Sequence, residues 1–348
     1  MKSLTNFSNR SPHDCNPMTT RPSTSIALCS YNGEPFIGEQ LESFLQQSIL
    51  PDELIICDDG SSDRTIEIIE TFSQQAPFPV NLICNKNNLG STKNFEQAIS
   101  LCQGEIIFLS DQDDIWHPKK IAITLNSFTP KQTVAVFSNA NIVDADNRGL
   151  GYDLWSSAPF EKQQQQLLIN NQPFEALLKH NFVTGATLAF RQELRPQILP
   201  IPEEWVHDGW IALLLSIFGD ITAIDQPLIN YRQHAANQIG GTRLTLWQRL
   251  NSLQTKQIYS QHYLDEAARY QQAYRHLEPN LSQQQKTTFL EKIEHCRNRG
   301  RLKNSRISRL PTAVTELVHG RYHRYAYGWY SVANDLLYHR IPSTKPTS

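Results

Sequence analysis

Three short polar stretches in the first third of the chain carry residue types suited to metal and phosphate chemistry. Each follows an apolar run: residues 30–32 (SYN), residues 58–63 (DDGSSD) and residues 110–114 (SDQDD). In an open α/β sheet, ligands bind beyond the carboxyl ends of the strands. If the apolar runs are neighbouring strands, the three stretches meet at one edge of the sheet and predict a ligand site there.

The last of these stretches has three carboxylates within four residues, Asp111, Asp113 and Asp114. Such carboxylates repel one another unless a cation or hydrogen-bond donors neutralise them. Hard oxygen ligands suit Mg²⁺ or Mn²⁺, and a few carboxylates leave metal positions open for phosphate oxygens. We therefore predict a divalent-metal site that also holds a diphosphate. For Asp114, capping of the segment that follows is an equal alternative.

Two other side chains at these strand ends suit a nucleotide. The ring of Tyr31 can stack on a base or a ribose, although tyrosines more often serve packing. The carboxylate of Asp58 can accept a hydrogen bond from a pyrimidine N–H. We add Asp59 to the candidate donor-binding residues, while noting that turn formation explains Asp59 and Asp63 equally well.

The pattern around these stretches predicts the elements that position them. Apolar runs at 26–29, 54–57, 80–84, 106–109 and 134–137 predict strands, and apolar residues at helical spacing lie between them. A further strand is expected over 183–190, a helix over 207–218 and a strand over 221–224. Beyond residue 241 no strand pattern recurs, and 244–301 is typical of helices. The fold class is therefore α/β, with a Rossmann-like, mostly parallel sheet flanked by helices and a C-terminal helical region.

Composition limits the remaining possibilities. The 348 residues include 32 Lys and Arg against 34 Asp and Glu, so no global field recruits nucleic acid. Six cysteines without a C-x-x-C pair favour a reduced, cytoplasmic protein. The most apolar stretch, 210–218, is far shorter than the roughly 20 residues of a spanning helix. The tail over 319–340 mixes His, Arg, Tyr and Trp with Leu and Val, which fits either an anionic membrane surface or a packed helix.

In their order and spacing, residues 30–32, 58–63, 88–90 (NLG) and 111–114 resemble glycosyltransferase family 2, whose fold is GT-A. The resemblance covers roughly residues 25–234. It implies a nucleotide-sugar donor, a base contact for Asp58, a ribose or metal contact for Asp111 and a metal-ligand role for Asp113. We divide the chain into a disordered leader (1–22), a GT-A domain (23–240) and a helical region (241–348).

The resemblance also points to a general base in the second half of the domain. An acceptor hydroxyl is a poor nucleophile, so an inverting transferase needs a carboxylate beside it. Judged from the local sequence alone, Asp208 fits a helix-capping role equally well. Members of the family, however, have an acidic pair at this position, and the second acid of the pair is the base. His207 replaces the first acid. We assign His207, Gly185 and Trp210 to the acceptor side, because a glycine lets backbone approach a ligand closely.

Residues 231–234 (YRQH) follow an apolar run and resemble the loop that closes over the donor in related transferases. Arg232 and His234 supply a cation and an imidazole for the oxygens of the departing diphosphate. The alternative is a surface loop in which Arg232 pairs with a nearby acid.

The layout most resembles bacterial rhamnosyltransferases of O-antigen or capsule synthesis. This resemblance implies a dTDP-rhamnose donor and a saccharide or lipid-linked saccharide acceptor. From the cysteines and the tail we expect a cytoplasmic enzyme, with the cytoplasmic face of the inner membrane as a second location. Three alternatives stay open: a UDP-hexose donor, a Mg²⁺-dependent phosphatase or phosphorelay domain, and a noncatalytic nucleotide-sugar-binding module.

Overall fold

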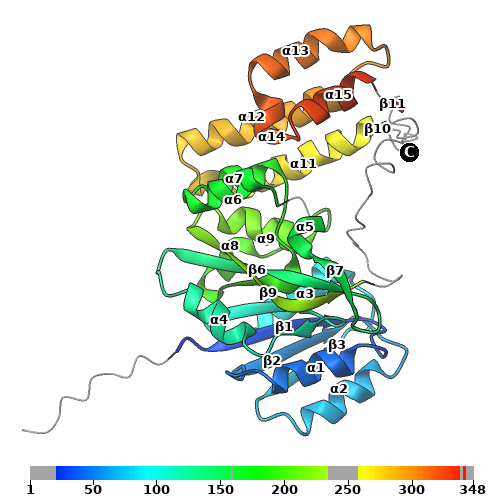
Figure 1. Cartoon of the computed structure of the whole chain (residues 1–348), viewed down its shortest axis with the longest axis vertical. Helices are drawn as coiled ribbons and strands as arrows, with labels where there is room; N and C mark the ends of the chain where they lie inside the picture. Colours follow the sequence, from blue (N-terminus) through cyan, green and yellow to red (C-terminus); the bar gives the residue numbers. More distant parts are fainter. Residues whose placement is uncertain (1–20, 158–159, 234–257, 338–339, 342–348) are drawn as a thin grey trace, which may run out of the picture.

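The computed structural model describes residues 21–157, 160–233, 258–337 and 340–341. A central sheet occupies the middle of the molecule, and a stack of helices drawn in yellow to red lies at one end (Figure 1). The strands of the sheet are β1 (Thr24–Ser30), β2 (Glu53–Asp58), β3 (Val80–Cys84), β4 (Ile106–Asp111), β5 (Ile115–Trp116), β6 (Thr133–Val143), β7 (Gly149–Asp153), β8 (Leu188–Arg191) and β9 (Asp220–Arg232).

The order of the strands is β3-β2-β1-β4-β8-β6-β9-β5, with β7 paired to β6. The first four strands in this order are parallel, and so are β6 and β9. Strand β8 runs antiparallel to both of its neighbours. The predicted α/β fold with a central sheet is confirmed, and the observed sheet is mixed, because β5, β7 and β8 pair antiparallel with their neighbours. The expected strand over 183–190 begins only at Leu188, because a 3₁₀ turn (Gly185–Thr187) precedes it.

The parallel register brings the predicted stretches together. Ser30 at the end of β1 lies opposite Asp58 of β2, and Cys29 lies opposite Asp111 of β4. Three polar stretches that are far apart in sequence therefore share one edge of the sheet, as expected for parallel strands.

Helices cover both faces of the sheet. They are α1 (Ile37–Leu45), α2 (Thr65–Ser73), α3 (Ser91–Leu101), α4 (Lys120–Ser127), α5 (Leu154–Ser157), α6 (Lys162–Ile169), α7 (Pro173–Lys179), α8 (Arg195–Ile198) and α9 (His207–Leu215). The glutamine run at 163–166 lies in α6, where the side chain of Gln164 is buried. One buried apolar cluster packs α1, α2 and α4 on one face, and a second packs α3 and α9 on the other.

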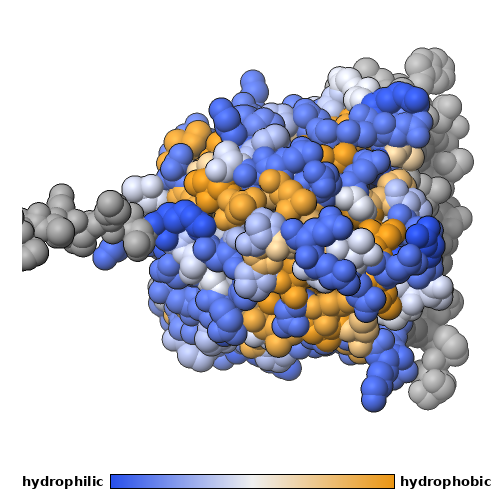
Figure 2. Space-filling model, turned by 90° about the horizontal axis from the view of Figure 1, so that it is seen from below, coloured by the Kyte–Doolittle hydropathy of each residue, from blue (hydrophilic) through white to orange (hydrophobic). Residues whose placement is uncertain are grey.

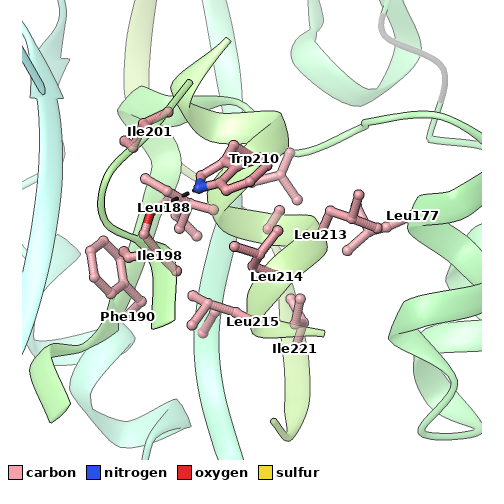
Figure 3. Close-up of a cluster of buried hydrophobic side chains, with 14 of the residues drawn as sticks. Leu177, Leu188, Phe190, Ile198, Ile201, Trp210, Leu213, Leu214, Leu215 and Ile221 are labelled. Carbon is pink, nitrogen blue, oxygen red and sulfur yellow. Dashed lines mark hydrogen bonds between the residues drawn. The ribbon is translucent and has the colours of Figure 1, made fainter. Parts of the chain in front are cut away.

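Trp210 anchors the second cluster. Its indole is 1% exposed and donates a hydrogen bond to the carbonyl oxygen of Ile198 at 2.7 Å. Leucine and isoleucine side chains from α9 and neighbouring strands surround the ring (Figure 3). The burial of this large side chain fixes α9, whose first turn enters the site described below.

The helical end contains α11 (Ser260–Leu277), α12 (Gln283–Gly300), α13 (Leu310–Val318), α14 (Arg321–Tyr325) and α15 (Trp329–Leu337). Strands β10 (Ile258–Tyr259) and β11 (Arg340–Ile341) form a short parallel pair beside them. The predicted C-terminal helical region is confirmed for residues 260–337, whereas residues 241–257 lie outside the described residues. Among the described residues, none of these helices combines the length and apolarity needed to span a bilayer.

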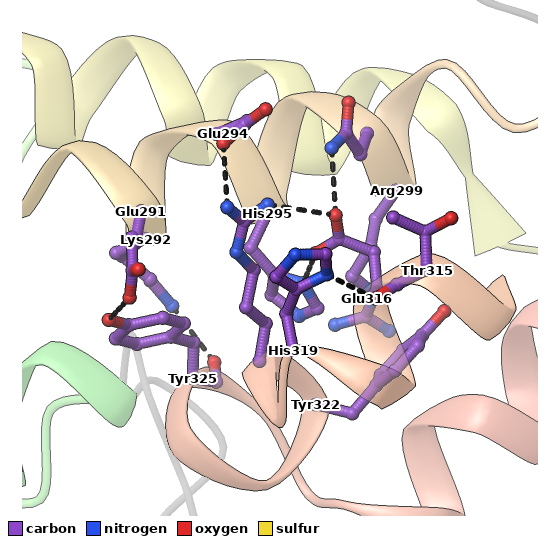
Figure 4. Close-up of polar contacts among 12 residues, drawn as sticks. Glu291, Lys292, Glu294, His295, Arg299, Thr315, Glu316, His319, Tyr322 and Tyr325 are labelled. Atoms are coloured by element: carbon purple, nitrogen blue, oxygen red, sulfur yellow. Dashed lines mark hydrogen bonds and ion pairs between the residues drawn. The ribbon is translucent and has the colours of Figure 1, made fainter. Parts of the chain in front are cut away.

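Buried polar contacts join these helices to one another (Figure 4). Glu316 of α13 lies 2.6 Å from Nδ1 of His295 on α12, and Arg321 donates to the same carboxylate. Asp335 of α15 accepts from Arg299 of α12 at 2.7 Å. Buried charges need such partners, because an unpaired charge in the interior is costly. The pairs therefore hold α13 and α15 in fixed places on α12.

Figure 2 shows the opposite end of the molecule, below α1 and α2 in Figure 1. Hydrophobic residues lie in patches between hydrophilic ones on this face. The apolar side chains of α1 and α2 that reach the surface, such as Leu45, Ile68 and Phe72, are only partly exposed and pack against the core. This face is therefore the edge of the core.

Candidate active site

A cavity of about 1580 Å³ lies at the carboxyl edge of the sheet and extends to the C-terminal helices. From the sheet side it is lined by Tyr31, Asp59, Asp111, Asp113, His207 and Asp208. From the helical side it is lined by Tyr263, Arg269, Tyr270, Tyr327 and Tyr330. The structure therefore brings most of the predicted site residues together in one cavity, and adds a wall from α11 and α15.

Asp58 is fully buried and does not line the cavity. Its carboxylate accepts hydrogen bonds from the hydroxyls of Ser30 and Ser61, at 2.7 and 2.6 Å, and from the backbone N–H of Gly60 and Ser61. Gly60 has φ of 85°, which favours glycine. In this structure Asp58 therefore shapes the loop after β2.

Asp59 lines the cavity and ties two predicted stretches together. Its carboxylate accepts from the backbone N–H of Leu89 and Gly90 at 2.8 and 2.9 Å, and from the side chain of Asn85. The NLG stretch is thus held against the end of β2. Both carboxylates are buried, and of the two Asp59 lies at the cavity wall.

The acidic stretch divides in the same way. Asp111 and Asp113 are partly exposed and line the cavity, whereas Asp114 is buried and accepts from the backbone N–H of Arg232. Burial, together with the charges of Asp113 and Asp208, raises the pKa of Asp111 to about 7. Crowded carboxylates of this kind are stabilised by a cation.

A divalent cation fits this donor set. Within the described part of the chain, no group of three or more His, Cys, Asp or Glu residues is placed to enclose a metal by itself. Asp111 and Asp113 would therefore contribute a few oxygens and leave the other positions to the ligand, as in sites where Mg²⁺ is shared with phosphates.

Asp208 faces the same cavity from the first turn of α9. Its two oxygens accept hydrogen bonds from the backbone N–H of Gly185 at 3.1 Å and from the side-chain amide of Asn181 at 3.0 Å. Burial raises the pKa of Asp208 to about 6. A carboxylate with a raised pKa and fixed orientation is suited to proton transfer.

His207 and Gly185 fit against each other beside this carboxylate. The imidazole stacks on Phe95 with 4.0 Å between ring centroids, and neither ring nitrogen has a hydrogen-bond partner among the described residues. Burial lowers the pKa of His207 to about 3, so the ring is neutral at physiological pH. A Cβ on residue 185 would lie 2.6 Å from Nε2 of His207. Only glycine leaves room for the ring while its N–H holds Asp208.

We expect Gly185→Ala to lower the free energy of unfolding by about 1–3 kcal/mol, because an added methyl group overpacks a filled site. Turnover should fall with it, since the N–H of residue 185 holds Asp208. Chemical denaturation and initial rates measure the two effects. Adding His207→Ala should recover part of the lost stability by removing the clash, and strictly additive effects would contradict the predicted contact.

Besides Asp58, the predicted residues Trp210 and Arg232 do not line the cavity, and Trp210 is part of the core. The predicted residue His234 lies outside the described residues. The buried guanidinium of Arg232 donates to the carbonyl of Asp113 at 2.8 Å and pairs with Glu39 at 2.7 Å, and it also contacts the carbonyl of Ala145. Arg232 thus supports the acidic stretch from below the cavity.

The sequence pattern did not indicate several residues that the structure adds to the site. Asn181, which lines the cavity, orients Asp208. On α11, Tyr263 and Tyr270 line the cavity seven residues apart, a spacing that places them on one helix face. This seven-residue spacing is the feature of the sequence that could have indicated the helical wall of the cavity.

Comparisons with known proteins agree with this geometry. The family model described as Glycosyl transferase family 2 matches residues 25–181. The chain is 36% identical over 221 residues to dTDP-rhamnosyl transferase RfbG of Shigella flexneri, covering 61% of this chain and 73% of that protein. It is 26% identical over 216 residues to the uncharacterized glycosyltransferase alr2836 of Nostoc sp. strain PCC 7120, covering 61% of this chain and 65% of that protein.

Among solved structures, S. aureus TarS residues 1–349 resemble this fold with a TM-score of 0.53 at 17% identity, covering 79% of this chain and 71% of that one. The fold and site define an α/β protein with an acidic cavity at the carboxyl ends of parallel strands, in the GT-A arrangement. The chain belongs to glycosyltransferase family 2.

Proposed function

We propose that this protein is an inverting glycosyltransferase that moves a sugar from a nucleoside-diphosphate donor to a saccharide acceptor in cell-surface polysaccharide synthesis. The observation that carries the proposal is the single cavity shared by Asp208, with its two fixed oxygens, and by Asp111 and Asp113. We further propose dTDP-L-rhamnose as the donor, on the basis of the 36% identity to the Shigella rhamnosyl transferase.

The donor lies, in this proposal, along the strand ends. Tyr31 is half exposed at the cavity and offers its ring to a base or a ribose. Asp111 and Asp113 would hold Mg²⁺ or Mn²⁺, which when bound offsets the negative charge of the departing diphosphate. Asp59 and Asp58 keep the surrounding loops in place through their backbone hydrogen bonds.

Asp208 acts as the general base. It takes the proton of the acceptor hydroxyl while the hydroxyl oxygen forms a bond to the anomeric carbon and the bond to the nucleoside diphosphate breaks. Attack opposite the leaving group inverts the anomeric configuration. Gly185 and Asn181 orient the carboxylate, so that its position does not depend on the acceptor.

The acceptor lies, in this proposal, between Asp208 and the helical wall. Tyr263, Tyr270 and Tyr327 line that part of the cavity, and aromatic faces pack well against sugar rings. Arg269 also lines it, and no carboxylate in the described part of the chain forms an ion pair with it. An acceptor saccharide with a negatively charged group suits this wall.

The two other classes of function receive less support. A phosphorelay or phosphatase needs an accessible aspartate at the end of β2, yet Asp58 and Asp59 are buried and occupied by backbone N–H groups. A noncatalytic binding module has no use for a carboxylate oriented as Asp208 is. Neither class explains the whole cavity.

The rhamnosyl assignment is tested by the linkage of the product. With dTDP-β-L-rhamnose, inversion is expected to give an α-linked rhamnosyl product, and NMR of the purified product reads the linkage. A β-linked product would contradict the inverting mechanism. Transfer from UDP-hexoses with no transfer from dTDP-rhamnose would retain the mechanism and reject the donor.

A further inference from the structure

Helix α13 at the far end of the molecule exposes an apolar stripe to solvent. Ile307, Leu310, Val314 and Val318 are 79%, 46%, 54% and 78% exposed, and the last three follow one another at four-residue spacing. Residues at this spacing share one helix face. Ala313 and Glu316, on the other side of the helix, are buried. The helix is thus held by one face and leaves its other, uncharged face bare.

The charges around this stripe are segregated. Residues 301–337 contain six Arg or Lys residues but only two acidic ones, Glu316 and Asp335. Both carboxylates are buried and paired inside the helical stack, Glu316 with His295 (Figure 4) and Asp335 with Arg299. Arg309 is buried as well, and Arg321 and Arg324 pair with Glu294 and Glu291 of α12. The cations of this segment that face solvent without an ion pair among the described residues are therefore Arg301, Lys303 and Arg306.

Three of the cations stand directly before the stripe. Arg301, Lys303 and Arg306 are exposed, and none forms an ion pair with another residue that the structure describes. An apolar helix face beside unpaired cations is the arrangement that binds an anionic lipid surface, because apolar groups enter the acyl boundary and cations meet the headgroups. The apolar patches at the opposite end (Figure 2) lack this feature, since the α1 and α2 side chains there are partly covered by the core.

We propose that the exposed face of α13, formed by Leu310, Val314 and Val318, docks on an anionic bilayer together with Ile307 of the preceding 3₁₀ turn and with the help of Arg301, Lys303 and Arg306. Helix α15 packs against α13, and its Tyr330 and Asn334 line the cavity. Docking on α13 therefore brings the helical wall of the cavity close to the membrane. The docking itself needs no transferase activity, so its test is independent of the proposed function.

Vesicle sedimentation of the full chain tests the proposal. The protein is mixed with vesicles of phosphatidylglycerol and phosphatidylcholine in equal parts, or of phosphatidylcholine alone. We expect binding to the anionic vesicles that weakens as salt is raised. Val314→Asp with Val318→Asp, and separately Lys303→Glu with Arg306→Glu, should each weaken this binding about tenfold or more. Because all four side chains are exposed, we expect these variants to fold. If the Val314→Asp, Val318→Asp variant misfolds, the Lys303→Glu, Arg306→Glu variant still tests the proposal.

Ile169→Asp is the matched control, because Ile169 is an equally bare apolar residue, 73% exposed, on α6. This variant should bind anionic vesicles as the unaltered chain does. Absence of binding by the unaltered chain would overturn the proposal, as would binding by both pairs of variants at the level of the unaltered chain. Light scattering tests the alternative that this face binds a second copy of the chain. A dimer that is lost in the Val314→Asp, Val318→Asp variant, in a protein that binds no vesicles, would assign the face to that second copy and overturn the proposal.

Discussion

Replacing Asp208 with asparagine is expected to lower kcat by about 10²- to 10⁴-fold, the range for loss of a general base. The amide cannot take the proton of the acceptor hydroxyl. It retains the shape of the carboxylate and can still accept one of the two hydrogen bonds that Gly185 and Asn181 donate. Donor affinity, measured by calorimetry, should therefore stay unchanged while turnover falls.

Stability separates this effect from damage to the fold. Loss of one hydrogen bond costs about 1 kcal/mol, and removal of a buried negative charge offsets it, so the unfolding temperature should change little. Asp225→Asn is the matched control, because Asp225 is an exposed carboxylate on β9. Turnover of the Asp208 variant close to that of the Asp225 variant would remove Asp208 as the base.

The pH dependence of turnover follows from the same carboxylate. A general base works in its ionised form, and burial raises the pKa of Asp208 to about 6. We therefore expect kcat to rise with pH through about 6 and to level off above it, as measured from initial rates at saturating substrates. A rate that is flat from pH 5 to 7 would contradict the role of this group.

Asp113→Ala is expected to weaken metal-dependent donor binding by about 10²-fold, because a bound cation contributes several kcal/mol at a diphosphate. The measurement is calorimetric titration of a nucleoside diphosphate in the presence of Mn²⁺. In EDTA the variant and the unaltered chain should bind equally weakly, which shows that the lost affinity belongs to the metal.

Asp146→Ala is the control for this variant, because Asp146 is an exposed carboxylate that pairs only with the exposed Arg148 among the described residues. Its donor affinity should equal that of the unaltered chain. An Asp113 variant with full affinity in the presence of Mn²⁺ would exclude that carboxylate as a metal ligand.

The residues at the carboxyl edge of the sheet were predictable from the sequence, because the register of parallel strands fixes which strand ends lie side by side. Once residues 26–29, 54–57 and 106–109 are strands of one sheet, the polar residues after them must meet. Apolar runs of this length followed by turn residues are a strong local signal. The sequence pattern therefore predicted Asp59, Asp111 and Asp113 at the cavity, where the structure places them.

The sequence pattern did not predict which way individual side chains point. Asp58 and Asp114 carry the same chemical group as their neighbours, but backbone direction turns them inward to backbone N–H groups. Arg232 lies beneath the acidic stretch because Glu39, nearly two hundred residues earlier, pairs with it. Such contacts depend on tertiary packing, which periodicity does not describe.

The helical wall of the cavity was missed for a related reason. Tyr263 and Tyr270 share one face of α11, which in sequence suggests packing as readily as binding. Their role depends on where α11 lies, and the buried pair of Lys292 and Glu266 between α12 and α11 helps to fix it. The position of a helix that is fixed by ion pairs with distant residues cannot be predicted from the sequence of that helix alone.

A thermal-shift titration of the full chain with nucleotide sugars tests the central claim, a metal-assisted donor site beside Asp208, most directly. dTDP-L-rhamnose and UDP-sugars are compared with and without Mn²⁺. We expect at least one of them to raise the unfolding temperature with Mn²⁺ present, and EDTA to abolish the rise. A metal-assisted donor site is contradicted if no nucleotide sugar stabilises the protein in Mn²⁺, or if the stabilisation is the same in EDTA.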